Sequence, residues 1–152
     1  MNHWLIKSEP ETFGIEALAA LPKKTTAWDG VRNYQARNFM RAMQVGDLAF
    51  FYHSSCPEPG IVGVMEIMRA AYTDPTQFDP ENHHFDPKST LEKPRWDGVD
   101  VGFKKKLKAV LALGELRAMP GLEGLALLRQ GNRLSVMPVT EEQWGVIKGR
   151  IG

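Results

Sequence analysis

Hydrophobic and polar residues follow two periods along the chain, and each period predicts one type of element. Short apolar runs bounded by turn residues predict strands, and apolar residues three or four positions apart predict helices. The expected strands are His3–Lys7, Leu48–His53, Ile61–Met68, Trp96–Leu111 and Leu134–Pro138. The expected helical segments are Ile15–Leu21, Asn33–Met43, Leu113–Met119, Gly124–Leu128 and a last helix that begins at Thr140. The sequence therefore predicts one α+β domain over residues 1–152, with five or six strands and small helices.

The segment Asn33–Met43 has the clearest amphipathic pattern. Its apolar face consists of Ala36, Phe39, Met40 and Met43. Arg37 and Arg41 fall on the opposite face at 100° per residue, and Asn33 is a suitable N-cap. We therefore expect this helix to pack one face on the core and to present arginines to solvent.

Two neighbouring strands are apolar on both faces, which indicates that the sheet is covered on both sides. Leu48–His53 and Ile61–Met68 are joined by a loop with two prolines, so we expect antiparallel pairing. A closed barrel and a sheet with helices against it both fit this pattern. The next connection, Asp74–Pro94, is polar and rich in proline, and its length is typical of a functional loop.

Composition and charge exclude several classes of protein. Hydrophobic residues make up 43% and charged residues 24%, as in ordinary globular domains. Lys and Arg total 19 against 18 Asp and Glu, so a nucleic-acid partner would need a local site and not a bulk basic surface. Cys56 is the one cysteine, which excludes an internal disulfide. No apolar run approaches the length of a membrane span and no signal-peptide pattern is present, so we expect a cytoplasmic protein without a membrane partner.

Patterns for metal or cofactor chemistry are missing. A zinc deaminase needs a cysteine pair that this chain lacks, and the adjacent His83 and His84 point apart on a strand. No glycine loop has the spacing of a phosphate-binding loop. We expect no metal and no cofactor. The triplet Lys7-Ser8-Glu9 leaves two interpretations open: a base and nucleophile set, or a strand end that caps a turn.

Aromatic residues near turns and strand ends, together with polar residues beside them, are typical of a site for a flat heterocycle. The aromatic residues are Trp28, Tyr34, Phe50, Phe51, Tyr52 and Trp96. The polar residues are Ser8, Asn33, His53, Ser54, Ser55 and Ser135. Such a ligand is held by stacking on its faces and by hydrogen bonds at its edges. Phe50 and Phe51 are expected in the core, whereas Trp28 and Trp96, each followed by Asp-Gly, are candidates for a pocket.

Two basic groups are candidates for contacts with phosphates. Arg32, Arg37 and Arg41 lie at the start and on one face of the expected helix. Lys104, Lys105 and Lys106 follow one another on the last long strand. Both groups can contact a nucleic-acid backbone, and both can equally be solvated surface charges.

The order and spacing of several motifs resemble the EVE domain family over nearly the whole chain. The matching motifs are Lys7-Ser8-Glu9-Pro10, the run from Trp28 to Asn38, Gly46-Asp47, Phe51-Tyr52-His53-Ser54, Ile61-Val62-Gly63, Asp86-Pro87-Lys88, Pro94-Arg95-Trp96 and the run from Leu134 to Val139. The resemblance implies a PUA-like fold, a mixed β pseudo-barrel with helices packed around it. It also implies kinship with the YTH domain, and binding of modified cytosine or related bases in DNA or RNA.

Carried over position by position, the resemblance implies a ligand pocket. Its residues are Lys7, Ser8, Trp28, Val31, Arg32, Asn33, Tyr52, His53, Ser54, Ser55, Trp96, Leu134 and Ser135. The expected function is therefore a non-enzymatic, monomeric binding module for a modified base. The alternative is a small hydrolase of modified nucleosides that uses Lys7, Ser8 and Glu9, because some PUA-like relatives in the ASCH group hydrolyse acylated nucleosides with such groups.

Overall fold

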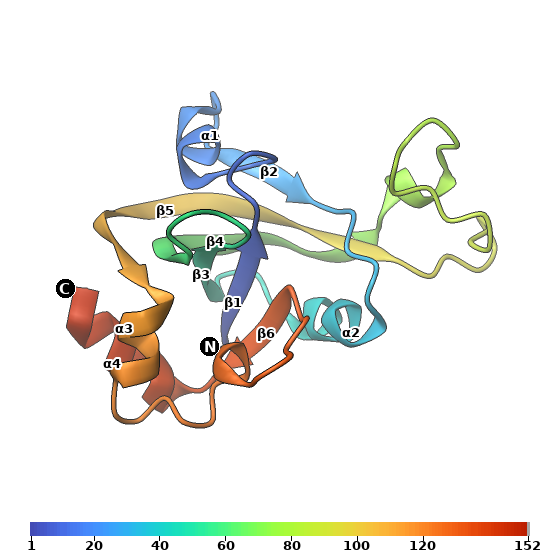
Figure 1. The fold of residues 1–152 in the computed structure, drawn as a ribbon. Helices are drawn as coiled ribbons and strands as arrows, with labels where there is room; N and C mark the ends of the chain where they lie inside the picture. Colours follow the sequence, from blue (N-terminus) through green and yellow to red (C-terminus); the bar gives the residue numbers. More distant parts are fainter. Residues whose placement is uncertain (152) are drawn as a thin grey trace.

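The protein is built on one mixed, six-stranded sheet (Figure 1). The computed structural model describes residues 1–151. The strands are β1 (His3–Ser8), β2 (Thr25–Trp28), β3 (Leu48–His53), β4 (Gly60–Thr73), β5 (Asp97–Ala112) and β6 (Val136–Val139). Their order in the sheet is β2-β5-β4-β3-β1-β6. β1 and β3 run parallel, with Ser8 beside His53, and the other pairs are antiparallel.

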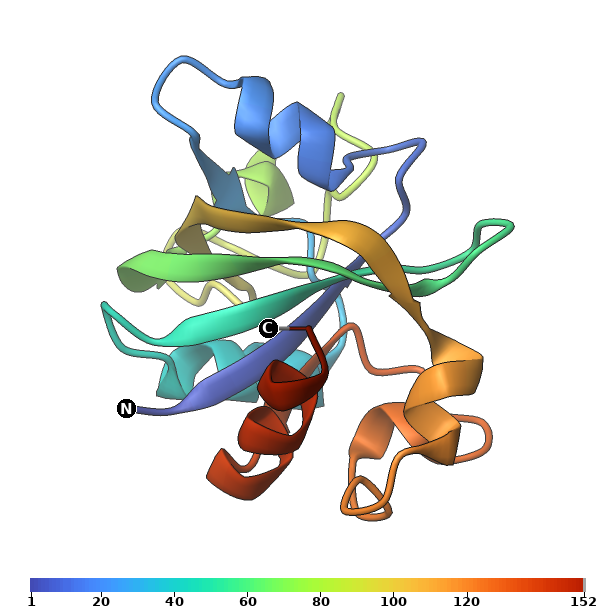
Figure 2. The same cartoon turned by 90° about the vertical axis from the view of Figure 1, so that its left-hand side faces the viewer.

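Four short helices and two 3-10 turns surround the sheet. They are α1 (Ile15–Ala20), α2 (Tyr34–Ala42), α3 (Leu113–Ala118) and α4 (Glu141–Ile151), with η1 (Pro75–Phe78) and η2 (Ala126–Leu128). Figure 2 shows α1 above the sheet, with α3 at the end of β5 and α4 below the sheet, on the side away from α1. The α+β, PUA-like architecture expected from the sequence is confirmed, as is the antiparallel β3–β4 pair.

Apolar residues on the two faces of the sheet form two separate core clusters. Trp4, Ile6 and Phe51 pack with residues of α1 and α2 in one cluster. Leu5 and Phe50, their immediate neighbours in sequence, pack with residues of α3 and α4 in the other. Because successive side chains of a strand point to opposite faces, consecutive residues in β1 and β3 must be apolar where both faces are covered.

The helix ends follow their sequence signals. The Asn33 side chain accepts a hydrogen bond from the Ala36 amide at 2.9 Å, so Asn33 caps α2 as expected. At the start of α4, the backbone amide of Gln143 donates to the Thr140 hydroxyl at 3.1 Å. The backbone amide of Thr140 donates to the side-chain oxygen Oε1 of Gln143 at 2.9 Å. This reciprocal pair is a capping box.

The strand β2 was not expected from the sequence, and the boundaries of β4 and β6 differ from the expected ones by more than one residue. β2 lacks an alternating pattern because it is a short edge strand that pairs with β5 alone among the described residues. β4 continues past Met68 to Thr73, because its polar end pairs with the start of β5 through register shifts. β6 begins at Val136 and runs through Pro138, which an edge strand tolerates.

The connection between β4 and β5 is held by one buried amide side chain. Gln77 is fully buried. Its NH₂ group donates to the carbonyl oxygens of Asp74 at 2.6 Å and Trp96 at 2.7 Å. Its carbonyl oxygen accepts from the amides of Arg95 at 2.9 Å and Trp96 at 3.0 Å. All the hydrogen-bonding groups of this side chain are therefore used to close the loop on itself.

Replacement of Gln77 by glutamate should destabilise the protein. Gln77→Glu keeps the shape but points a carboxylate oxygen at two carbonyl oxygens, so we expect a loss of about 3 kcal/mol in the free energy of unfolding. Urea denaturation at neutral pH measures it. Gln35→Glu, on an exposed position of α2, is the control and should change stability by less than about 0.5 kcal/mol. Equal stability of the two variants would contradict this role of Gln77.

Candidate functional site

A pocket of about 390 Å³ opens at the seam of the curved sheet, where its two edge strands approach each other. Figure 1 shows β2 and the start of β6 on either side of the end of β1. The lining residues are Lys7, Ser8, Thr12, Phe13, Thr26, Ala27, Trp28, Asp29, Gly30, Val31, Arg32, His84 and Ser135. β1, β2, the turn before α2, the β4–β5 loop and the segment before β6 all contribute. The pocket is therefore a product of the whole topology and not of one local motif.

Trp28 is the large aromatic residue of this pocket. Its indole meets the ring of Phe51 edge-on, with centroids 5.5 Å apart, and the ring of Phe13 in a similar way at 6.0 Å. These contacts fix the indole, while its partial exposure leaves aromatic surface in the pocket. Within residues 1–151 the indole N–H donates no hydrogen bond, so it is available to a ligand.

Two other polar groups of the pocket also have no hydrogen-bond partner among the described residues. They are the Lys7 ammonium and the Ser135 hydroxyl. Burial lowers the pKa of Lys7 below its ordinary value. The Ser8 hydroxyl, in contrast, donates its proton to the Phe13 carbonyl oxygen at 2.5 Å. An aromatic wall with unpaired donors at its edges is suited to a flat, polar ring.

The turn that carries Trp28 is anchored by the buried carboxylate of Asp74. It accepts hydrogen bonds from the Gly30 amide at 2.8 Å and from the guanidinium of Arg32 at 3.0 Å. It also accepts from the amide and hydroxyl of Thr76, at 2.7 and 2.6 Å. Burial raises the pKa of Asp74, but the hydrogen bonds from Thr76, Gly30 and Arg32 outweigh burial and hold this pKa below the ordinary value. The carboxylate is thus a stable anion at neutral pH.

Arg32 and Gly30 join the same turn to His84 of the β4–β5 loop. The Arg32 guanidinium donates to the His84 carbonyl oxygen at 2.8 and 2.9 Å, so this side chain is occupied by protein groups. Gly30 has a φ of +77°, and a Cβ there would lie 2.6 Å from the His84 ring. Only glycine allows the imidazole to pack this closely on the turn and to form part of the pocket wall.

Several residues expected in the pocket lie elsewhere. Tyr52 is buried in the cluster beside α3 and α4, Leu134 packs against both clusters, and Asn33 is committed to its cap. Trp96 is 6% exposed and covered by the stacked ring of Tyr34, and its N–H donates to Asp86 at 2.7 Å. Ser54 and Ser55 do not line the pocket. Lys7, Ser8, Trp28, Val31, Arg32 and Ser135 are the expected residues that the structure brings together.

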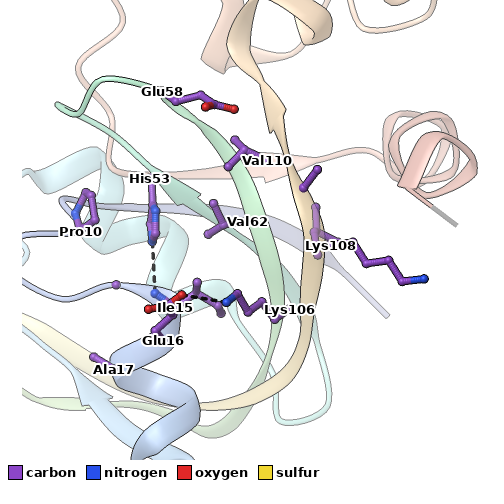
Figure 3. Close-up of a pocket in the computed structure, with 13 residues that line it drawn as sticks. Pro10, Ile15, Glu16, Ala17, His53, Glu58, Val62, Lys106, Lys108 and Val110 are labelled. Atoms are coloured by element: carbon purple, nitrogen blue, oxygen red, sulfur yellow. Dashed lines mark hydrogen bonds and ion pairs between the residues drawn. The ribbon is translucent and has the colours of Figure 1, made fainter.

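His53 faces a different cavity, of about 510 Å³, between α1, β4 and β5 (Figure 3). Its Nε2 accepts a hydrogen bond from the Ile15 amide at 3.1 Å, and burial lowers its pKa. Glu16 and Lys106 form an ion pair at 2.8 Å in the same cavity. The segment from Pro10 to Gly14 separates this cavity from the one that contains Trp28.

The candidate phosphate-binding residues are largely paired within the protein. Lys104 contacts Glu66 at 3.5 Å, Lys106 contacts Glu16, and Arg41 pairs with Asp97. Arg37 donates to the Arg95 carbonyl oxygen at 2.9 Å and covers the Tyr34 ring. None of Lys104, Lys105 and Lys106 lines the pocket. Exposed ion pairs contribute little, so a phosphate can replace the glutamate partners of Lys104 and Lys106.

The catalytic alternative finds no assembled set of groups. No hydrogen bond joins Lys7 to Ser8 or Glu9 among residues 1–151, and the proton of the Ser8 hydroxyl is given to a backbone carbonyl. Glu9 is exposed and does not line the pocket. The described residues contain no cluster of metal-ligating side chains and no helix long and apolar enough to span a membrane.

Sequence reasoning missed seven of the lining residues: Thr12, Phe13, Thr26, Ala27, Asp29, Gly30 and His84. Two of them carried a signal. Asp29 follows Trp28 directly, and His84 lies in the long proline-rich loop that its length marked as functional. Thr26 and Ala27 reach the pocket through the β2 edge strand, and Thr12 and Phe13 through the loop after β1. No period in the sequence indicates either segment.

Comparisons with known proteins agree with this fold and pocket. The model of the EVE domain family matches residues 2–149. Human thymocyte nuclear protein 1 is 48% identical over 163 residues, which cover 96% of this chain and 72% of the relative. A crystal structure of a protein from Pseudomonas putida has a TM-score of 0.94 and 58% identity, over 97% of each chain.

One of the similar solved structures contains bound DNA. The crystal structure of the human THYN1 protein in complex with DNA containing 5-methylcytosine has a TM-score of 0.94 and 46% identity, over 99% of this chain and 97% of that one. Fold and pocket thus define a PUA-like module with a pocket for a flat ring. The chain belongs to the EVE domain family.

Removal of the Asp74 charge should loosen the turn and do so in a pH-dependent way. Asp74→Asn should cost about 3 kcal/mol at neutral pH, because an amide cannot accept all four hydrogen bonds. A lowered pKa stabilises the folded state above the ordinary value of 3.8, and that contribution is lost as the pH falls through the lowered pKa.

The stability difference between wild type and Asp74→Asn should therefore stay constant above about pH 5 and shrink below it. Urea denaturation at a series of pH values measures this difference. Asp79→Asn, at an exposed position of the same loop, is the control and should stay within about 0.5 kcal/mol of wild type at neutral pH. A difference between wild type and Asp74→Asn that does not change with pH would rule out the proposed anionic anchor.

Proposed function

We propose that this protein binds a modified cytosine, such as 5-methylcytosine, in DNA or RNA and releases it chemically unchanged. The observation that carries the proposal is the seam pocket, in which Trp28 stands beside unpaired polar groups. A relative with 46% identity has been crystallised with DNA that contains 5-methylcytosine, which supports the same ligand class here. The unassembled state of Lys7, Ser8 and Glu9 supports binding without turnover.

Recognition in such a pocket combines a face and an edge of the base. The base stacks on Trp28, a contact worth about 1–3 kcal/mol. Lys7, Ser135 and the indole N–H supply donors for the acceptor atoms of the pyrimidine edge. A volume of about 390 Å³ is within the range of small-molecule pockets and is suited to one nucleotide base.

The base must leave its stack to enter the pocket. Extrusion from a duplex costs a few kcal/mol, so single strands and destabilised duplexes are the favoured substrates. A net charge of +1 and the pairing of Lys104 and Lys106 with glutamates imply weak, salt-sensitive contact with the backbone. Arg37, Arg41 and the run from Lys104 to Lys106 are the proposed phosphate contacts.

The remaining expectations from the sequence belong to the same proposal. We propose that residues 1–152 act as one domain and as a monomer in the cytoplasm, and that RNA as well as DNA is bound. Light scattering measures the oligomeric state. A panel of DNA and RNA oligomers of the same sequence measures the preference between DNA and RNA.

Trp28→Ala should weaken binding of a single-stranded oligomer with one 5-methylcytosine by about tenfold to a hundredfold, since the stacking surface is lost. Fluorescence anisotropy at low salt measures the affinity, and thermal denaturation confirms that the variant is folded. Tyr34→Ala removes a half-exposed aromatic ring outside the pocket and should change affinity by less than about twofold. Wild-type affinity in folded Trp28→Ala, or release of an altered base by wild type, would refute the proposal.

A further inference from the structure

A pocket for 5-methylcytosine must reject thymine, and shape cannot achieve this. Both pyrimidines carry a methyl group at C5 and have nearly the same outline. They differ at position 4, where cytosine carries an amino donor and thymine an oxygen acceptor. Rejection of thymine therefore requires a hydrogen-bond acceptor in the pocket that meets position 4.

Asp29 is the carboxylate among the pocket-lining residues, and no other described residue donates a hydrogen bond to it. The structure gives it a hydrogen bond to its own backbone amide. It directly follows Trp28, and its side chain is partly buried. Burial raises the pKa of Asp29, and the nearby charge of Asp74 raises it further. The free lone pairs of this carboxylate face the pocket residues and can accept a hydrogen bond from a ligand.

Neighbouring groups do not fill this role. Asp74 already accepts four hydrogen bonds from the turn and the β4–β5 loop. The Ser8 hydroxyl, which donates to Phe13, is a neutral and hence weaker acceptor than a carboxylate, and Lys7 and the Trp28 indole carry only donors. Among the charged side chains that line the pocket, Asp29 is thus the acceptor left for a ligand.

We propose that Asp29 is the specificity-determining residue that accepts a hydrogen bond from the exocyclic amino group of the bound base and so selects cytosines over uracil and thymine. This inference rests on the proposed function and identifies the exocyclic amino group as the part of the base that determines specificity. An ionised carboxylate attracts the amino group and repels the oxygen at the same position. The donors Lys7, Ser135 and Trp28 then meet the acceptor atoms of the cytosine edge.

The test uses four single-stranded oligomers that differ in one base: cytosine, 5-methylcytosine, uracil and thymine. This panel varies the methyl group and the amino group independently. For wild type at about pH 8 we expect 5-methylcytosine to bind at least about tenfold more tightly than thymine. In Asp29→Asn this ratio should fall to about one, because an amide can turn to donate or to accept.

Glu81→Gln is the matched control. It removes the same charge from an exposed position of the β4–β5 loop, where the side chain has no partner among the described residues. It should raise the affinity for all four oligomers alike and leave their ratios unchanged. An unchanged ratio of 5-methylcytosine to thymine in Asp29→Asn would overturn the inference while the proposed function stands. Equal binding of 5-methylcytosine and cytosine by wild type would count against the proposed function. The role of Asp29 would then be tested by the ratio of the affinities for cytosine and uracil.

A change in the ligand makes the test independent of the stability of the variant. An oligomer with 5-methyl-2-pyrimidinone lacks the amino group and keeps the methyl group and the ring. Wild type should bind it at least about tenfold more weakly than 5-methylcytosine. Equal affinity for these two oligomers would show that position 4 is not read and would overturn the inference.

Discussion

The geometry of the pocket depends on the hydrogen bonds around the buried carboxylate of Asp74. They tie the turn after β2 to the loop between β4 and β5, two segments more than forty residues apart in sequence. A buried anion is tolerated only when donors surround it, and Arg32, Gly30 and Thr76 provide them. Trp28 and Asp29 sit at the start of this turn, so their placement follows from the same network.

An incompletely closed sheet provides the space for the site. β2 and β6 are the two edges of the sheet, and no strand pairing joins them. Both edges are short, and Pro138 removes one backbone donor from β6, which limits pairing with other chains. Side chains and not a seventh strand fill the gap between the edges. A pocket that interrupts a sheet in this way has rigid walls, and its polar groups remain unpaired until a ligand enters.

Most of the fold could be predicted from the sequence, because buried apolar residues recur there with the spacing of a strand or a helix. β3 and α2 are examples, with apolar residues on both faces or on one stripe. The site could be predicted only in part. Trp28 and Trp96 each precede Asp-Gly, yet Trp28 ends an edge strand in the pocket and Trp96 is covered by Tyr34. The difference arises from strand order, and His53 was misplaced for the same reason, since its neighbours depend on which strands pair.

β1 pairs with β3 on one side and with β6 on the other, and this arrangement has a consequence for the synthesis of the protein. β1 precedes the other strands in sequence, but β6, which pairs with its second edge, is completed only at Val139. Until then Leu5 and Ile6 belong to a strand with an open edge, which is a state prone to aggregation. Ser135 of the pocket also arrives at this late stage. A nascent chain that stops before Val139 would therefore expose the edge of β1 and lack a complete pocket, and synthesis of β6 supplies both.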